Sequence, residues 1–312
     1  MQQVLTIILP VFAFMGLGWG AARTKFLGRD VETGLGAFTL WVAIPALLFR
    51  LMTESEPAEG SAWGLWFAFF LAAAVAWGFA SALAVVLKRP QGTAASFGMG
   101  AAFGNTVMLG IPLALATIGE RAVLPLALIT AVHAPLLWLL STVQIELAGS
   151  NREVPIAKLL RDLLVVLVKN PVISALIAGL LWRYTGLGLH PIVDDIITKL
   201  GQAAIPCALF AMGMSLATYS LKGELRAAPA LTFIKLVIMP LCVWVLAYHV
   251  FDLPPAWAGT ALILSAVPTG VNAYLFAVRY DCGVASVSGT IALSALVSVA
   301  TLSVVIAFLG KT

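Results

Sequence analysis

Ten stretches of mostly apolar residues, each about 20 residues long, follow one another along the chain of 312 residues. A helix of this length spans the hydrocarbon core of a bilayer. Because a backbone surrounded by lipid must satisfy its polar groups internally, such a chain folds as a bundle of membrane-spanning helices. We therefore predict an all-α integral membrane protein with ten transmembrane helices, at about residues 2–22, 34–52, 62–87, 94–117, 121–147, 163–184, 192–217, 227–250, 256–279 and 284–309.

The composition agrees with a membrane protein and excludes several other classes. Hydrophobic residues make up 61% of the chain and charged residues 10%, against roughly 25% charged residues in soluble domains. The net charge of +4 comes from basic residues scattered between apolar segments, so we expect no nucleic-acid partner. Cys207, Cys242 and Cys282 fit small core residues better than disulfides or a metal site. The chain lacks the motifs of ATP-binding loops and zinc helices, so we expect neither an enzyme nor a cofactor.

Basic residues are concentrated in alternate loops, which sets the expected orientation. The first apolar run has no basic residue before it, the pattern of a membrane span and not of a signal peptide. Loops rich in Lys and Arg stay in the cytoplasm, and an even number of spans then places both termini on the non-cytoplasmic face of the inner (plasma) membrane. Twelve basic residues fall on the cytoplasmic side and four on the other: Arg23, Lys25, Arg29, Lys88, Arg89, Arg152, Lys158, Arg161, Lys169, Lys222, Arg226 and Arg279, against Arg50, Arg121, Arg183 and Lys311.

The two halves of the chain share landmarks at a constant offset. Residues 42–49 recur as residues 203–210 with five identities in eight, at an offset of 161. The pairs Pro10 and Pro171, and Gly18 and Gly179, keep the same offset. A shared offset indicates an internal repeat, and five spans per repeat is an odd number, so the halves must be inverted in the membrane. We expect a first five-helix repeat at residues 1–149 and a second at 150–312, joined by a linker at about residues 147–162.

Polar residues, glycine and proline interrupt the fourth and ninth spans. Residues 104–112 and 265–272 contain the expected helix-break residues Gly110, Pro112, Pro268 and Gly270. Proline removes a helical hydrogen bond, and an unwound segment at the same place in each half of an inverted repeat is typical of a transporter's binding site. We expect the half-helices after Gly110 and Gly270 to direct free N–H groups and positive dipole ends at a ligand.

Polar side chains in and near these interruptions are the candidate substrate contacts. Amides can face a ligand or cap a half-helix, and small hydroxyl residues can face a ligand or bond their own backbone. A histidine inside a membrane is a candidate proton acceptor or carboxylate partner, although it can also be structural. The candidate substrate-binding residues are Asn105, Asn272, Thr106, Ser265, Thr269 and His133, with no metal site. Lys235, two turns from the cytoplasmic end of the eighth span, either extends to the interface or pairs with an acceptor elsewhere in the protein.

Several of these segments resemble the auxin efflux carrier family, which includes plant carriers and bacterial malonate carriers. Residues 105–113, NTVMLGIPL, resemble the family's NTLVMGIPL segment. Residues 267–271 with Phe276, Ala277 and Tyr280 resemble its LPQGI and FAKEY segments, and residues 169–171 resemble its RNP motif. The resemblance implies a scaffold domain of spans 1, 2, 6 and 7, and a transport domain of spans 3–5 and 8–10. It further implies that crossing broken helices 4 and 9 hold an organic carboxylate and that the transport domain moves like an elevator.

The chain also departs from the plant pattern. The loop between the halves is short, and no charged residue lies between Glu59 and Lys88, where plant members carry charges in the third span. Asn272 and Ala273 stand where plant sequences tend to have an apolar residue and a proline. Regulation from a long loop and the role of the third-span charges therefore cannot be transferred to this chain.

An anion is the expected cargo because each Asp and Glu falls in a loop or near a span end, which leaves no central carboxylate for a cation. We expect a secondary active transporter, an efflux carrier for small carboxylates that are auxin-like or dicarboxylates such as malonate. The alternatives are a sodium-coupled organic anion symporter of the related bile-acid type and a membrane sensor that binds the ligand without transporting it. The expected partners are a small carboxylate substrate and the lipid bilayer; the oligomeric state stays open, with a homodimer as one option.

Overall fold

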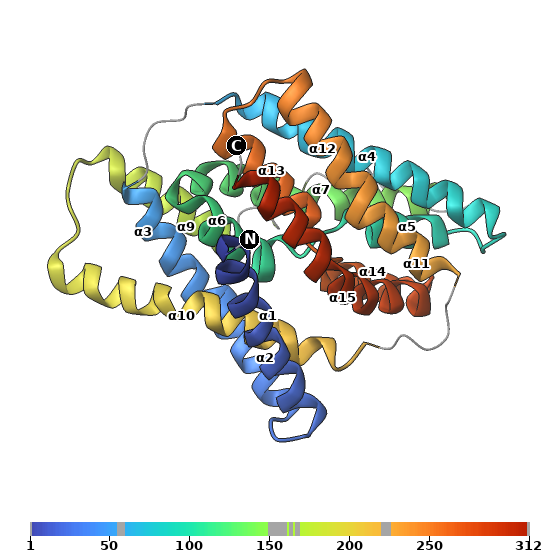
Figure 1. The fold of residues 1–312 in the computed structure, drawn as a ribbon, viewed down its shortest axis with the longest axis horizontal. Helices are drawn as coiled ribbons and strands as arrows, with labels where there is room; N and C mark the ends of the chain where they lie inside the picture. The colour runs from blue at the N-terminus through green and yellow to red at the C-terminus, as the bar shows by residue number, and fades with distance from the viewer. Residues whose placement is uncertain are drawn as a thin grey trace.

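The computed structural model describes residues 2–54, 60–148, 161, 165, 169–219 and 226–310. Within these ranges all regular secondary structure is helical (Figure 1). Seven helical segments in the described chain are long and apolar enough to cross a membrane: Thr6–Arg23, Arg29–Glu54, Ala62–Val86, Thr106–Ala148, Pro191–Leu216, Ala227–Val250 and Val284–Leu309. The protein is therefore an all-helical, multi-pass membrane protein. Most of the expected linker and the boundary between residues 149 and 150 lie outside the described residues, as do Arg152, Lys158, Lys222 and Lys311.

The described residues contain seven such segments, fewer than the ten spans predicted, and three shorter helices lie where further spans were expected. α5 (Thr93–Ala102), α9 (Pro171–Tyr184) and α13 (Pro255–Ala266) are each shorter than a full span. The segment Thr106–Ala148 in turn contains a change of direction at Gly119, whose φ of +80° is left-handed. There the short turn η3 (Gly119–Ala122) joins α6 (Ile111–Ile118) to α7 (Val123–Ala148).

Three prolines of the membrane-spanning segments come just after a wide π turn. η1 (Thr39–Ala43) ends two residues before Pro45, η2 (Thr106–Gly110) two before Pro112, and η4 (Ile234–Ile238) two before Pro240. Proline cannot donate a backbone hydrogen bond and its ring crowds the preceding turn. A π turn shifts the hydrogen-bond pattern by one residue, so the helix continues through the proline.

The helices form two groups. The first helix group contains α1 (Gln2–Arg23), α2 (Arg29–Phe38), α3 (Ile44–Glu54), α9 and α10 (Pro191–Leu216). The second contains α4 (Ala62–Val86), α5 to α7, α11 (Ala227–Phe233), α12 (Met239–Val245), α13, α14 (Val271–Arg279) and α15 (Val284–Leu309). Figure 1 shows α3, α9 and α10 on one side of the molecule and α4, α5 and α11 on the other. One hydrophobic core lies within the second group, and another fills the space between α1, α3, α9, α10 and the facing ends of α6, α7, α13 and α15.

Glycines allow the helices of the first group to approach closely. α1 packs on α10 and α3 packs on α9. A Cβ atom on Gly18 would overlap the Phe210 carbonyl oxygen, and one on Gly179 would lie 2.6 Å from the Phe49 carbonyl oxygen. Small residues at such contacts permit backbone-to-backbone packing in membranes.

The second group is held by small side chains and by interhelical hydrogen bonds. α4 has 25 residues and none of them is charged, so it is about 37 Å long at 1.5 Å per residue and can cross a bilayer. Six of its alanines are buried. Trp77 Nε1 donates to Gln144 Oε1 at 2.7 Å, and Gln144 Nε2 donates to Ser81 Oγ at 3.2 Å, which joins α4 to α7.

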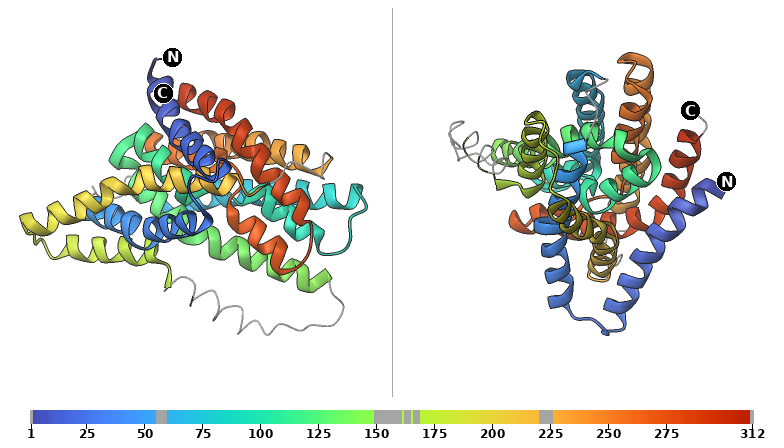
Figure 2. Two further views of the ribbon diagram at one scale, coloured as in Figure 1. Left: turned by 90° about the horizontal axis from the view of Figure 1, so that it is seen from below. Right: turned by 90° about the vertical axis from the view of Figure 1, so that its left-hand side faces the viewer.

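The first turn of α1 and the last turn of α15 lie close together on one side of the molecule (Figure 2).

Candidate functional site at the crossing of two interrupted helices

Two interrupted helices meet in the middle of the protein. α5 ends at Ala102 and η2 begins at Thr106, while α13 ends at Ala266 and α14 begins at Val271. The exposed backbone of each interruption bonds to the other: Asn105 N–H donates to the Pro268 carbonyl at 2.8 Å, and Gly270 N–H donates to the Phe103 carbonyl at 2.9 Å. Gly104 and Thr269 form an antiparallel bridge between them. The two breaks therefore satisfy each other's polar backbone groups, as a membrane interior requires.

The first interruption lies earlier than the sequence predicted. Gly110 has helical dihedral angles (φ −65°, ψ −46°), and Pro112 follows within α6. The π turn η2 absorbs the missing N–H of Pro112, so the half-helix begins at Thr106 and not after Gly110. In the second interruption, Pro268 and Gly270 both lie between α13 and α14.

A cavity of about 310 Å³ lies between the two helix groups at this crossing. The N-terminal turns of both half-helices line it, through Thr106 and Val107 on one side and Val271 and Asn272 on the other. In the first half-helix, Thr106 N–H is bonded to the Gly104 carbonyl and Met108 N–H to Asn105 Oδ1. The positive ends of both half-helices face this one space. The full lining is Glu32, Gly36, Leu40, Phe103, Gly104, Asn105, Thr106, Val107, Met108, Thr130, Ala134, Asn170, Ala211, Met212, Ser215, Gly270, Val271 and Asn272.

Three of the six candidate contacts line this cavity: Asn105, Thr106 and Asn272. Asn105 is buried; its Oδ1 accepts a bond from Met108 N–H at 3.2 Å, and its Nδ2 lies 3.2 Å from Met212 Sδ on α10. A thioether is a weak acceptor, so the amide retains donor capacity for a ligand. Among the described residues, none hydrogen-bonds to the Asn272 side chain. Its amide is therefore also available to a ligand.

The other three candidates lie behind the cavity wall. Ser265 Oγ donates to the Leu262 carbonyl at 2.8 Å, a bond within its own helix. Thr269 Oγ1 donates to the Gly100 carbonyl at 2.7 Å, and Thr269 N–H donates to Ser294 Oγ at 3.1 Å. These bonds anchor the second interruption to α5 and α15.

His133 is buried in α7 and packs against aromatic rings. Its ring centroid is 4.7 Å from that of Phe103 and 5.6 Å from that of Phe69. The ring lies near the Gly104 backbone, but neither nitrogen has a well-formed hydrogen bond within the described residues. Phe103 lines the cavity, whereas His133 lies behind Phe103 and does not line it.

Polar residues that the sequence did not single out as contacts also line the cavity. Glu32 is in the first turn of α2, and Asn170 caps α9 by accepting from Val172 N–H at 2.9 Å. Glu32 and Asn170 each follow a loop that carries basic residues. The end of the cavity that they line therefore faces the same side of the protein as those loops. Ser215 and Met212 come from α10. The sequence placed Glu32 near a span end, but only the packing of α2 beside η2 and α10 brings it to the site.

Lys235 is fully buried. The first of the two alternatives drawn from the sequence, that this lysine extends to the interface, is therefore not supported. It lies in η4, and its Nζ donates to the Ser265 carbonyl at 2.5 Å and to Met239 Sδ at 3.4 Å. A Cβ atom placed on Gly104 would be 3.3 Å from Nζ. The lysine therefore lies directly behind the crossing, at the carboxyl end of α13.

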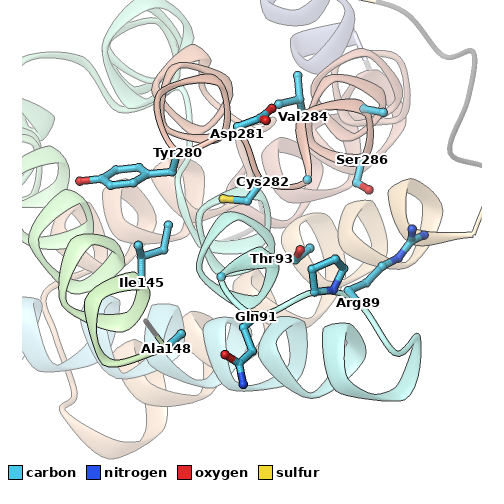
Figure 3. Close-up of a pocket in the computed structure, with 14 residues that line it drawn as sticks. Arg89, Gln91, Thr93, Ile145, Ala148, Tyr280, Asp281, Cys282, Val284 and Ser286 are labelled. Atoms are coloured by element: carbon cyan, nitrogen blue, oxygen red, sulfur yellow. The ribbon is translucent and has the colours of Figure 1, made fainter. Parts of the chain in front are cut away.

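A second pocket, of about 550 Å³, lies at the ends of α4, α7 and α14 (Figure 3). Arg89 lies on one side of it and Tyr280 on the opposite side, with Cys282 between them. Cys282 Sγ is 2.8 Å from Ser96 Oγ, and burial raises the pKa of this thiol. This pocket contains none of the candidate residues, so the crossing is the better candidate site.

The arrangement at the crossing suits recognition of an anion. The cavity is lined by three side-chain amides, the Thr106 hydroxyl and two helix N-termini, which supply hydrogen-bond donors, and by one carboxylate, that of Glu32. The described residues contain no group of three or more His, Cys, Asp or Glu that could hold a metal ion. The fold is thus that of a multi-pass membrane protein in which two crossed, interrupted helices lie beside a cavity, an arrangement typical of transporters.

Comparisons with known proteins assign the family. The chain belongs to the auxin efflux carrier family, described as "Membrane transport protein", which matches residues 3–306. It is 27% identical to a Rhizobium meliloti (strain 1021) protein named "Putative malonate transporter", over 97% of this chain and 95% of that protein. It is 23% identical to the Arabidopsis thaliana "Auxin efflux carrier component 8", over 89% of this chain and 90% of that protein. The family resemblance drawn from the sequence motifs is therefore confirmed.

Proposed function

We propose that the protein is a secondary active transporter that exports small organic carboxylate anions, either auxin-like acids or dicarboxylates such as malonate. The observation that carries the proposal is the pair of half-helix N-termini that face one cavity beside the Asn105 and Asn272 amides. Donors arranged in this way bind a carboxylate without requiring a buried counter-ion. Two relatives whose names refer to malonate and auxin support the same class of substrate.

An inverted repeat of ten helices accounts for the packing of the first helix group. The contact of Gly18 with Phe210 becomes the contact of Gly179 with Phe49 when the two halves are exchanged, since both pairs are 161 residues apart (179 − 18 and 210 − 49). The two hydrogen bonds at the crossing also exchange, at an offset of 165 (268 − 103 and 270 − 105), which pairs Phe103 with Pro268 and Asn105 with Gly270. Such reciprocal contacts are what a pseudo-two-fold axis produces.

The two helix groups correspond to a scaffold and a moving transport domain. Both interruptions belong to the second group, and the cavity lies between this group and α2 and α10 of the first. Movement of the second group past the first as a rigid body would carry the site across the membrane, as an elevator does. With the basic loops in the cytoplasm, the cavity would face the cytoplasm and both termini the opposite side of the plasma membrane.

Flux into and out of proteoliposomes tests the proposal. Vesicles loaded with labelled malonate or labelled auxin should release one of them faster when the protein is present. They should also respond to an imposed potassium diffusion potential. Binding of an acid without any flux would favour a sensor, and the absence of both would refute the proposed function.

Glu32 supports one alternative, coupling to a cation. Its carboxylate is partly buried and lines the cavity, and an acidic group at such a place can bind sodium or a proton. The matched variant Glu32→Gln separates the two schemes. A carrier driven only by the anion gradient and the membrane potential keeps its flux in this variant, while a cation symporter of the bile-acid type loses it. A proton relay through His133 would instead appear as a changed pH dependence in His133→Ala.

A further inference from the structure

The cavity at the crossing has two walls of different chemical character. The wall formed by the second helix group presents the Asn105 and Asn272 amides and the N-terminal turns of both half-helices, which donate hydrogen bonds. The wall formed by the first helix group presents Glu32 from α2. An ionised carboxylate only accepts hydrogen bonds. Glu32 is also the one charged side chain among the described residues that line the cavity.

The charge of Glu32 is directed to the cavity more than to other side chains. Its side chain is partly buried. Arg29, one turn earlier in α2, interacts with it electrostatically, but Arg29 is exposed and does not line the cavity. Tyr219, which is also close enough to interact with Glu32, supplies no positive charge. The ion pairs of the described residues involve other carboxylates, those of Glu54, Asp194 and Asp195.

A fixed carboxylate in an anion site restricts what the rest of the ligand can be. When the crossing holds one carboxylate of a ligand, the remainder of that ligand lies in the same cavity as Glu32. Like charges repel strongly where water is partly excluded, so a second ionised carboxylate is disfavoured there. An N–H or O–H group instead donates a charge-assisted hydrogen bond to Glu32. A repulsive group of this kind is a common source of specificity.

We propose that Glu32 is the specificity-determining residue of the transport site, which accepts a hydrogen bond from the far end of a monocarboxylate and rejects a second ionised carboxylate. This inference rests on the proposed function and narrows it. The substrate is then a monoanion that carries an N–H or O–H donor away from its carboxylate. Indole-3-acetate, with its ring N–H, fits this description, and malonate fits it only as the singly protonated acid.

Two pairs of probes test the charge and the donor separately on the unmodified protein. Malonate and its monoamide differ in the second negative charge, and indole-3-acetate and its N-methyl derivative differ in the ring N–H. At a pH at which free carboxyl groups are ionised, calorimetric titration in detergent should show the monoamide binding roughly tenfold or more tighter than malonate. Indole-3-acetate should bind tighter than its N-methyl derivative. Malonate that binds as tightly as its monoamide would overturn the assignment and leave the proposed transport function intact.

Substitutions of Glu32 assign these preferences to its carboxylate. Glu32→Gln removes the charge and keeps an acceptor, so malonate should gain roughly tenfold in affinity while the monoamide changes less. Glu32→Ala removes both, so the two indole acids should bind equally. Asp30→Asn is a matched control, because Asp30 is in the same first turn of α2 but is exposed and does not line the cavity. We expect no change in this control.

The contrary outcomes are distinct. A folded Glu32→Gln variant, with an unchanged elution profile, that binds malonate as weakly as wild type would overturn the role of Glu32. Malonate binding that requires sodium in wild type and is lost in Glu32→Gln would show that the carboxylate holds a cation, which also overturns it. A wild-type protein that neither binds nor moves any of the four acids would refute both this inference and the proposed function.

Discussion

The two interruptions at the crossing are similar in their backbone and different in their side chains. Each donates one backbone hydrogen bond to the other. In the first, the Asn105 side chain caps its own half-helix and lines the cavity. In the second, Thr269 is bonded to α5 and α15, the Lys235 ammonium group covers the carboxyl end of α13, and Gly270 offers no side-chain cap to α14.

Both interruptions line the cavity, but only the second is also anchored from behind. The first presents Asn105 and Thr106 to the cavity, and the second presents Asn272 while three hydrogen bonds hold its buried side. In the proposed repeat, residues 70–74 of α4 stand at the offsets of Lys235 (235 − 165 and 235 − 161), and all of them are apolar. A repeat that binds an asymmetric molecule needs such a division, since identical halves would present identical groups on both sides of the ligand.

The largest effect is expected at Gly104, where the two interruptions are closest. In Gly104→Val, the new Cβ would lie 2.9 Å from Val267 Cγ2 and 3.3 Å from the Leu264 carbonyl oxygen. Overpacking of this kind costs about 1–3 kcal/mol or more, so we expect loss of substrate binding and a lower unfolding temperature. Gly20→Val is the control, because nothing lies within 4 Å of a Cβ at Gly20. Equal behaviour of the two variants would contradict the close crossing.

The two asparagines should differ in what their loss affects. Asn105→Ala and Asn272→Ala should each weaken carboxylate binding by about 1–3 kcal/mol, because a donor in a buried site is lost. Asn105→Ala should in addition lower stability by about 0.5–2 kcal/mol, because it removes a helix cap. Calorimetric titration and thermal unfolding in detergent measure the two quantities.

Asn105→Asp sharpens this comparison. An aspartate can still accept the Met108 N–H bond and keep the cap, but it adds a negative charge to the cavity. We expect normal stability and no binding of a carboxylate. Unchanged affinity in both alanine variants would remove the amides from the site.

The two threonines test the division at smaller scale. Thr269→Val removes the bond to the Gly100 carbonyl and should lower the free energy of unfolding by about 1 kcal/mol, with little effect on affinity. Thr106→Val removes a hydroxyl from the cavity lining and should reduce affinity with little effect on unfolding. The reverse pattern would show that Thr269, and not Thr106, contacts the ligand.

The smallest expected effect is that of sodium. A carrier driven only by the anion gradient and the membrane potential should keep its liposome flux unchanged when choline replaces sodium. An imposed potential should alter net flux, because moving one charge through 100 mV is worth about 2.3 kcal/mol. A strict sodium requirement would instead favour the bile-acid type of carrier.

The sequence by itself determined the membrane-spanning class, the family and the approximate places of the two interruptions. Long apolar runs and prolines act locally, through the length of a helix and the loss of one N–H group, so they are readable without a structure. The exact place of the first break was not readable, because a π turn can absorb the defect of Pro112 without ending the helix.

Only the tertiary structure decided which polar residues face the cavity. Lys235 and Ser265 are 30 residues apart, and Thr269 and Gly100 are 169 apart. The direction of a hydroxyl or an amine in a membrane depends on the nearest acceptor, and that acceptor comes from whichever helix packs alongside. Glu32 and Asn170 joined Asn105 and Asn272 at one cavity for the same reason: packing of separate helices, and not spacing along the chain, sets which side chains share a space.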